Sequence, residues 1–372
     1  MSNVSLLIPD MPFCLGAMNT PKNPLGIPNV YPFQLEINSS LGRLEQTIDA
    51  PLEKVLKKAY EVGNEMGTPS DNTELGLPYV DDFIRFIDQS VSCRGSLLEI
   101  GAGTGFMSKR LSQDGWQVTS IEPGVGYEQY WESHGVEVIN DFFPTNLVQD
   151  QFDVIIFYTV LEHLKDTKGF LASVRKQLKP DGKIFLAVPD CTLEISQRDP
   201  SILLHEHFHY FTKASLANTM FEAGLTACVE PSQFGRSLFA VGTIAADAQL
   251  PSVNAAIISD LETYITYIPK ARASIQDNLT NWLKNGEVGM FCASRLLNFC
   301  QVDADFLFYD DAEGLKGKYY PPFTSAVGNR EKLFNDVPKT LLIGSRTFGK
   351  KLKSELLSAG LKSNIILMSD LI

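Results

Sequence analysis

The chain has 372 residues, of which 44% are hydrophobic and 20% are charged, and this length predicts two or three domains. Its formal net charge of −12 excludes a broad surface for nucleic acids or anionic membranes, because the field would repel phosphate groups. The six cysteines form no C-x-x-C pair, which favours reduced thiols in the cytoplasm over disulfides or structural zinc. No apolar run reaches ~18 residues and prolines interrupt the apolar start, so neither a membrane span nor a signal peptide is expected.

Residues 1–75 are predicted to form a small N-terminal, substrate-side module. Up to about residue 45 the chain is rich in Pro, Asn and Gly, a composition typical of irregular structure or short strands. A helix is then predicted, with Asp49 as N-cap and Pro51 in the first turn. The stretch GTPSDNTELGLP, residues 67–78, is interpreted as a linker or binding loop, and an amphipathic helix follows through Val80, Phe83 and Ile87.

Residues 76–250 are predicted to be a Rossmann-like α/β core of seven strands. Five short apolar runs alternate with turns or helical stretches: SLLEI, QVTSIE, VEVIN, FDVIIFY and KIFLAVP. This alternation predicts a parallel sheet with helices on both faces. Two further runs, LTACVEP and SLFAVGTIA, are joined by SQFGR and predict a closing antiparallel pair.

Residues 251–372 are predicted to contain a helical connector and a second, smaller α/β domain. Apolar residues keep helical spacing on both sides of Pro269, which predicts two helices or one helix kinked at the proline. The runs VGMFCA, FLFYDD, TLLIGS and NIILMSD, with a helix at about 348–359, predict the second domain.

The stretch LLEIGAGTGF is the most informative segment of the core. It places Gly101, Gly103 and Gly105 in the turn after the first strand, where glycine permits positive φ and close approach of a ligand. A dinucleotide fingerprint would need its third glycine at the position of Phe106, which argues against a nicotinamide cofactor. The observed E-x-G-x-G-x-G pattern, with Glu99 before the first glycine, resembles motif I of the class I methyltransferases. This resemblance implies S-adenosylmethionine as the cofactor.

Three later segments extend the resemblance. Glu122 ends the next strand, where a carboxylate can accept both ribose hydroxyls. The resemblance implies that Asp141 binds the adenine amine with Phe142 beside the ring, and that FYTVLEHL closes over the sulfonium. The candidate residues of this last segment are Phe157, Tyr158 and His163. Alternative interpretations are that Glu99 mainly fixes the turn and that Phe142 or Phe157 is a core aromatic residue.

A second cluster, HEHFHYF at residues 205–211, matches the zinc-protease pattern H-E-x-x-H at His205-Glu206-x-x-His209. That pattern requires one helix face, whereas the next helix is predicted to start only after Thr212 as its N-cap. The cluster is therefore predicted to lie in a loop or extended stretch beyond the fifth strand, and no metal is expected. Ligand chemistry gathers at this edge of a parallel sheet, so the loop is predicted to serve the methyl acceptor.

This region resembles the sugar C-methyltransferases, which act on nucleotide-linked 4-keto-6-deoxyhexoses. The resemblance rests on HEHFHYFT and LANTMFEAGL, on FLFYDDAEGLKGKYYPP in the last third, and on YPFQLEINSSLGRLEQTID near the start. It implies that Glu206 and His207 form an acid/base centre and that His163 lies near the transferred methyl. In such an enzyme a base removes the proton beside the ketone, and the resulting enolate attacks the methyl group.

The chain departs from that family at three places. The stretch EINSSLG lacks the paired zinc cysteines of the N-terminal module, Leu204 replaces a tyrosine, and CASRLLNF replaces a glycine-rich turn. An O- or N-methyltransferase acting on a sugar or another small metabolite is therefore kept as an alternative, and so is a non-catalytic nucleotide-binding scaffold. The expected partner is a small molecule, with the acceptor atom, the histidine that acts as base and the oligomeric state left open.

Overall fold

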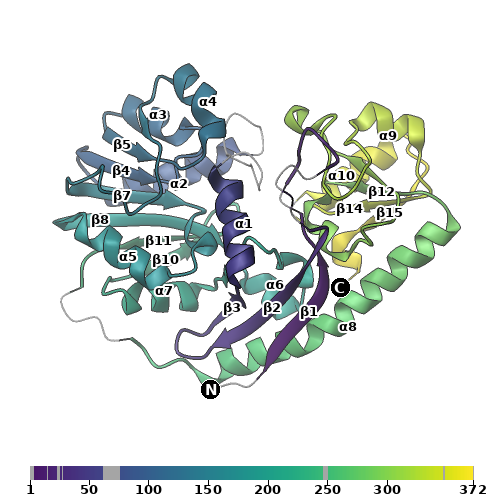
Figure 1. Cartoon of the computed structure of the whole chain (residues 1–372), viewed down its shortest axis with the longest axis horizontal. Helices are drawn as coiled ribbons and strands as arrows, with labels where there is room; N and C mark the ends of the chain where they lie inside the picture. Colours follow the sequence, from purple (N-terminus) through teal and green to yellow (C-terminus); the bar gives the residue numbers. More distant parts are fainter. Residues whose placement is uncertain are drawn as a thin grey trace. The chain divides into compact units, whose positions relative to one another are not determined.

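The computed structural model describes residues 4–14, 16–22, 26, 28–61, 76–245, 250–346 and 348–371. The chain forms two compact units, shown in Figure 1 with colours that follow the sequence. The described residues of unit 1 fall within the ranges 36–193 and 206–261, and those of unit 2 fall within the ranges 4–35, 194–205 and 262–371. These boundaries differ from the predicted divisions at 75 and 250, because the chain leaves and re-enters each unit. Most of the predicted loop at 67–78 lies outside the described residues.

Unit 1 is built on a seven-stranded sheet with the order β10-β11-β8-β7-β4-β5-β6. Its strands are β4 (Ser96–Ile100), β5 (Gln117–Ile121), β6 (Val138–Ile139), β7 (Phe152–Tyr158), β8 (Leu178–Pro189), β10 (Cys228–Pro231) and β11 (Ser237–Gly242). Strands β4 to β8 pair in parallel, whereas β11 pairs antiparallel with both β8 and β10. The predicted Rossmann-like core is confirmed. Because the strand order reverses between β4 and β7, their carboxyl ends flank a topological switch point.

Helices cover both faces of this sheet. They are α2 (Leu77–Ser90), α3 (Phe106–Gln113), α4 (Glu128–His134), α5 (Thr167–Lys176) and α7 (Lys213–Glu222). Side chains of a strand alternate between faces, so Ile155 of β7 packs in the cluster with α5 and α7, and Ile156 packs in the cluster with α2 and α3. The predicted apolar positions Val80, Phe83 and Ile87 of α2 are all buried.

Two helix starts follow the predicted caps. Asp49 Oδ1 accepts a 2.8 Å hydrogen bond from the Leu52 N–H at the start of α1 (Ala50–Glu61). Thr212 forms a capping box with Ser215 at the start of α7. Just before it, β9 (His209–Tyr210) pairs antiparallel with β3 (Arg43–Thr47), so the histidine cluster is turn and strand, as predicted, and not helix.

Unit 2 holds the second, smaller α/β fold that the sequence predicts. Its parallel sheet has the order β13-β12-β14-β15, formed by β12 (Val288–Phe291), β13 (Phe306–Tyr309), β14 (Thr340–Ile343) and β15 (Asn364–Leu367). Its helices include α9 (Arg330–Asp336) and α10 (Gly349–Ser358). Strand β1 (Ser5–Pro12) and most of β2 (Val30–Asn38) also belong to unit 2, and α6 (Thr192–Gln197) enters it.

The predicted helical connector is a single helix, α8 (Ala255–Asn285), with Pro269 inside it. This decides between the two alternatives left open by the sequence. Among the described residues, no helix combines the length and apolar character needed to cross a membrane.

Candidate active site

The glycine-rich turn after β4 has three glycines with different roles. All three adopt the left-handed region, with φ of +77° at Gly101, +52° at Gly103 and +74° at Gly105. A Cβ atom on Gly101 would lie 2.6 Å from Val160 Cγ2, and one on Gly105 would lie 2.6 Å from Val136 Cγ2. A Cβ on Gly103 would meet nothing within 4 Å. Packing therefore requires the outer two glycines, while the backbone at Gly103 is open to an approaching ligand.

Glu122 lies directly after β5 and holds this turn. Its side chain is 8% exposed; Oε2 accepts a 2.9 Å hydrogen bond from the Gly103 N–H, and Oε1 accepts a 2.8 Å bond from the Gly124 N–H. Burial raises the pKa of this carboxyl, and the two N–H bonds oppose that rise. A carboxylate has about four lone-pair sites, so Glu122 can hold the turn and still accept ribose hydroxyls. Its position fits the predicted cofactor role.

Glu99 lies in the core. Its carboxyl accepts a hydrogen bond from the Ser108 hydroxyl of α3, and burial raises its pKa to about 8. The Ser108 hydroxyl also lies 2.6 Å from the Ser120 hydroxyl of β5. These contacts tie β4, α3 and β5 together, so they favour the alternative in which Glu99 stabilises the turn without contacting the cofactor.

Asp141 and Phe142 follow β6 at the same edge of the sheet. Asp141 accepts hydrogen bonds from the Thr145 hydroxyl at 2.5 Å and from the Phe142 N–H at 2.8 Å, and these bonds lower its pKa. Lys57 Nζ of α1 lies 5.1 Å from the centre of the Phe142 ring, within range of a cation–π contact. Their adenine contacts remain a prediction.

The last two residues of β7 point to opposite faces of the sheet. Phe157 is fully buried, with its ring 5.3 Å from that of Phe170 of α5. Phe157 belongs to the core cluster, which favours the alternative in which it is a core aromatic residue. Tyr158 is half-buried and its ring lies 5.2 Å from that of Phe83 of α2, where burial raises its pKa. Tyr158 stays a candidate for the cofactor site.

Two of the clustered histidines, His205 and His209, are buried and contact backbone carbonyls. His205, in unit 2, contacts the Tyr31 carbonyl through Nε2 at 3.0 Å, and its ring packs 4.7 Å from that of Phe13. His209, in unit 1, contacts the Leu164 carbonyl through Nε2 at 2.8 Å. Burial lowers the pKa of His205 to about 4 and that of His209 to about 3. Both rings are neutral and donate to backbone carbonyls, and these contacts favour His207 over His205 and His209 as the base.

The other predicted catalytic residues come together. His163, in the short helix η2 (Leu161–His163) after β7, lies with its Nδ1 2.9 Å from the Glu206 carbonyl oxygen. Its ring centroid is 4.9 Å from that of His207, and Tyr60 Oη of α1 lies 3.0 Å from His163 Nδ1. Because a carbonyl only accepts, Nδ1 carries the proton and Nε2 presents its lone pair. Burial lowers the pKa of His163 to about 4, which keeps the ring neutral.

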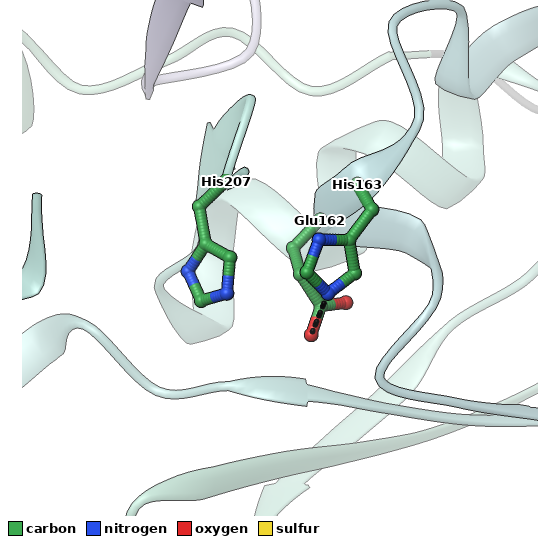
Figure 2. A group of neighbouring side chains, drawn as sticks. All are labelled: Glu162, His163 and His207. Atoms are coloured by element: carbon green, nitrogen blue, oxygen red, sulfur yellow. Dashed lines mark ion pairs between the residues drawn. The ribbon is translucent and has the colours of Figure 1, made fainter. Parts of the chain in front are cut away.

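Glu162 belongs to this group although the sequence reasoning missed it. Its side chain is 1% exposed, Oε1 lies 3.8 Å from His163 Nε2, and Oε2 makes no hydrogen bond with the described residues. Burial raises its pKa to about 8. Glu206 is also buried. Its pKa is raised well above the usual value, mainly by burial and to a lesser extent by the negative charge of the nearby Glu162. Figure 2 shows the Glu162, His163 and His207 side chains gathered together. The available sequence signal was the position of Glu162 beside His163, in the loop after a strand at the switch point.

Backbone contacts join this group to the glycine turn. The Phe208 N–H donates a 2.7 Å hydrogen bond to the Glu162 carbonyl, which fixes the two loops against each other. Val160, two residues before Glu162, is the side chain that a Cβ on Gly101 would strike. The glycine turn follows β4, and Glu162 and His163 follow β7. The two loops therefore lie on either side of the switch point between these strands.

The comparisons with known proteins concern the core of the chain. Residues 76–230 match the family model described as Methyltransferase domain. The chain is 29% identical over 113 residues to a ubiquinone biosynthesis O-methyltransferase of Pseudomonas entomophila (strain L48), covering 28% of this chain and 49% of that protein. A second such enzyme, from Actinobacillus pleuropneumoniae serotype 5b (strain L20), is 30% identical over 110 residues, covering 26% and 47%. The chain thus spans about half the length of these curated relatives.

Solved structures with a similar core include a DhpI-SAM-HEP complex, with a TM-score of 0.42, 19% identity and coverage of 53% of this chain and 99% of that one. Another is a 1,6-didemethyltoxoflavin-N1-methyltransferase of Burkholderia thailandensis, with a TM-score of 0.41, 16% identity and coverage of 55% and 96%. The family match therefore indicates a methyltransferase domain at residues 76–230, and the open backbone at Gly103 and the carboxylate of Glu122 suit the predicted S-adenosylmethionine cofactor.

Proposed function

We propose that this chain transfers the methyl group of S-adenosylmethionine to the carbon beside the ketone of a nucleotide-linked keto-sugar. The observation that carries the proposal is the meeting of His163 with Glu206 and His207, from segments 43 positions apart. The resemblance to sugar C-methyltransferases assigns these three residues to one centre. They gather next to the glycine turn, where the methyl donor is expected.

In this reaction the chain must orient the acceptor and handle one proton. Bound S-adenosylmethionine supplies an electrophilic methyl group and a thioether leaving group. His207 is the proposed base that takes the proton from the carbon beside the ketone, and Glu206 precedes it in the same loop. A positioned base contributes ~10²–10⁴-fold in rate, and orientation contributes up to about 7–11 kcal/mol.

His163 is proposed to lie near the transferred methyl and to present its Nε2 lone pair there. Its ring is held from the other side, where Nδ1 meets the Glu206 carbonyl and the Tyr60 hydroxyl at 2.9 and 3.0 Å. A ring fixed in this way keeps one tautomer and one orientation through the reaction. The proposed site therefore combines a proton carrier, His207, with a ring of fixed orientation, His163.

The parts of the chain outside the core support a sugar-nucleotide acceptor. Unit 2 supplies a second parallel α/β sheet, and the resemblance to the sugar C-methyltransferases implies a Rossmann-like domain in this C-terminal part of the chain. We propose that the segments on either side of the core, residues 1–75 and 251–372, serve this acceptor in the cytoplasm. The missing zinc cysteines imply that the N-terminal segment either folds without metal or is partly degenerate.

An O- or N-methyl acceptor is the second candidate. The curated relatives are named as O-methyltransferases, and Leu204 occupies the position of the family's tyrosine. A histidine base serves a hydroxyl acceptor as well, because that acceptor also loses one proton.

A labelled-methyl assay separates the candidates. The purified chain is incubated with methyl-labelled S-adenosylmethionine and a panel of nucleotide-linked keto-sugars, each paired with its reduced hydroxyl counterpart. We expect label only with a keto-sugar, and a new C–CH₃ centre in the NMR spectrum of the product. A product carrying O–CH₃ or N–CH₃ would contradict C-methylation and support the second candidate.

A further inference from the structure

We propose that Glu162, His163 and His207 form a binding site for a divalent transition metal of the zinc class. Each residue offers one ligand atom, and the three atoms lie within 4.8 Å of one another (Figure 2). No metal is expected from the sequence, because the H-E-x-x-H match lies outside a helix. This site is a different one: it takes only His207 from that cluster and adds two residues from the loop after β7.

The donor set selects the ion. Two imidazole nitrogens and one carboxylate oxygen suit Zn²⁺ and its neighbours, whereas Mg²⁺ and Ca²⁺ prefer oxygen ligands. Two ligands at about 2.1 Å from a tetrahedral zinc lie about 3.4 Å apart. Glu162 Oε1 and His163 Nε2 are 3.8 Å apart, so a shift of a few tenths of an ångström completes this edge. Three protein ligands also leave a fourth position open, as in zinc sites that bind water or substrate.

Two further observations on His163 and Glu162 favour a bound cation at this site. His163 directs Nδ1 at the Glu206 carbonyl, 2.9 Å away, which leaves Nε2 as the ligand atom; metal-bound histidines are commonly held in this way. Glu162 is 1% exposed, and its Oε2 makes no hydrogen bond with the described residues. A cation beside this carboxylate would compensate its burial. The Phe208 N–H to Glu162 carbonyl bond, 2.7 Å, fixes the loops that carry the ligands.

Metal binding would oppose catalysis. A zinc ion takes the nitrogen lone pairs of His163 and His207, and the proposed base needs such a lone pair to accept a proton. The zinc-loaded enzyme is therefore inactive and recovers when a chelator removes the ion. This inhibition rests on the proposed function, whereas binding of the ion does not, so the two are measured separately.

Zinc binding is tested by calorimetric titration and by the visible spectrum of bound Co²⁺, with no substrate present. Cys93 and Cys228 are exposed, so the background carries Cys93→Ser and Cys228→Ser to remove thiol sites. We expect one Zn²⁺ per chain and no binding of Mg²⁺ under the same conditions. Loss of an outer-shell partner costs ~10–100-fold in metal affinity, so Glu162→Gln and His207→Ala should each cost at least that. The control, His134→Ala, should leave zinc affinity unchanged.

The site would be disproved if zinc affinity stayed the same in both Glu162→Gln and His207→Ala, or if His134→Ala weakened it equally. Thermal unfolding without metal checks that each variant folds, and because His207 is only partly buried, its variant covers a failure of the Glu162 variant. In a further outcome, the wild-type chain binds zinc and the two variants lose zinc affinity as expected, while zinc leaves methyl transfer unchanged. That result would overturn the proposed inhibition and, separately, the assignment of His207 as the base.

Discussion

Truncation of Glu122 should weaken cofactor binding without disturbing the acceptor side. In Glu122→Ala, the bonds to the Gly103 and Gly124 N–H groups, 2.9 and 2.8 Å, are lost together with the predicted ribose contacts. Hydrogen bonds to charged groups contribute about 1.5–3 kcal/mol, which corresponds to a rise of about 10- to 150-fold in the dissociation constant. Glu122→Gln keeps one acceptor oxygen and turns an amide N–H toward a backbone N–H, so it should fall between Ala and wild type.

The assay is calorimetric titration with S-adenosylmethionine, at a temperature where thermal unfolding shows that each variant is folded. Exposed Glu137 offers the matched control, since Glu137→Gln removes a carboxylate just before β6 and leaves the bonds of Glu122 to the Gly103 and Gly124 N–H groups in place. Its affinity should equal that of the wild type. A dissociation constant for folded Glu122→Ala within twofold of wild type would refute the ribose role of this residue.

The remaining predictions concern catalysis, packing and pH. His207→Ala should keep its cofactor affinity and lose about 10²-fold or more in turnover; full turnover would exclude it as the base. Gly101→Ala should reduce the free energy of unfolding by roughly 2–4 kcal/mol, because the alanine is strained in the left-handed region and also overpacks against Val160. Gly103→Ala should reduce it by about 1–2 kcal/mol through the backbone strain alone, and should weaken cofactor binding. Equal losses for the two variants in denaturant titrations would contradict the packing argument. Glu99, whose pKa is raised from 4.5 to about 8 in the folded state, holds a proton that the unfolded chain releases, so stability falls as pH rises between these values. Glu99→Gln should remove this slope, on the order of 1.4 kcal/mol per pH unit, and an unchanged slope in melts from pH 5 to 8 would contradict it.

The core was predictable because its signals are local. The spacing of Gly101, Gly103 and Gly105 identifies the cofactor turn, and alternating apolar runs identify the strands of the sheet. The cap at Thr212 also separated the histidine cluster from the following helix, which excluded a zinc-protease helix. Each of these features depends on neighbours within a few positions of the chain.

Other features depend on tertiary contacts. Phe157 looks like a ligand contact in a motif, but the pleat of β7 turns it into the core against Phe170. Glu162 carried no pattern of its own, and its burial becomes visible only where the loop after β7 meets the loop before β9. Tyr60 reaches His163 from a helix 103 positions away in the sequence.

The unit boundaries could not be predicted from the sequence, because they too depend on tertiary contacts. Sequence patterns predict domains as continuous segments, whereas residues 4–35 and 194–205 belong to unit 2 together with residues 262–371. Between these two residue sets, His205 and Tyr31 are joined by a 3.0 Å contact that no local spacing predicts.

The most direct test of C-methylation is proton exchange at the acceptor carbon. A nucleotide-linked keto-sugar that the labelled-methyl assay has identified as the acceptor is incubated in deuterated water with the chain and S-adenosylhomocysteine, and the position beside the ketone is followed by NMR. We expect deuterium to enter there, and His207→Ala to slow the exchange by about 10²-fold. A wild-type enzyme that methylates this sugar yet never exchanges that proton would contradict an enolate mechanism.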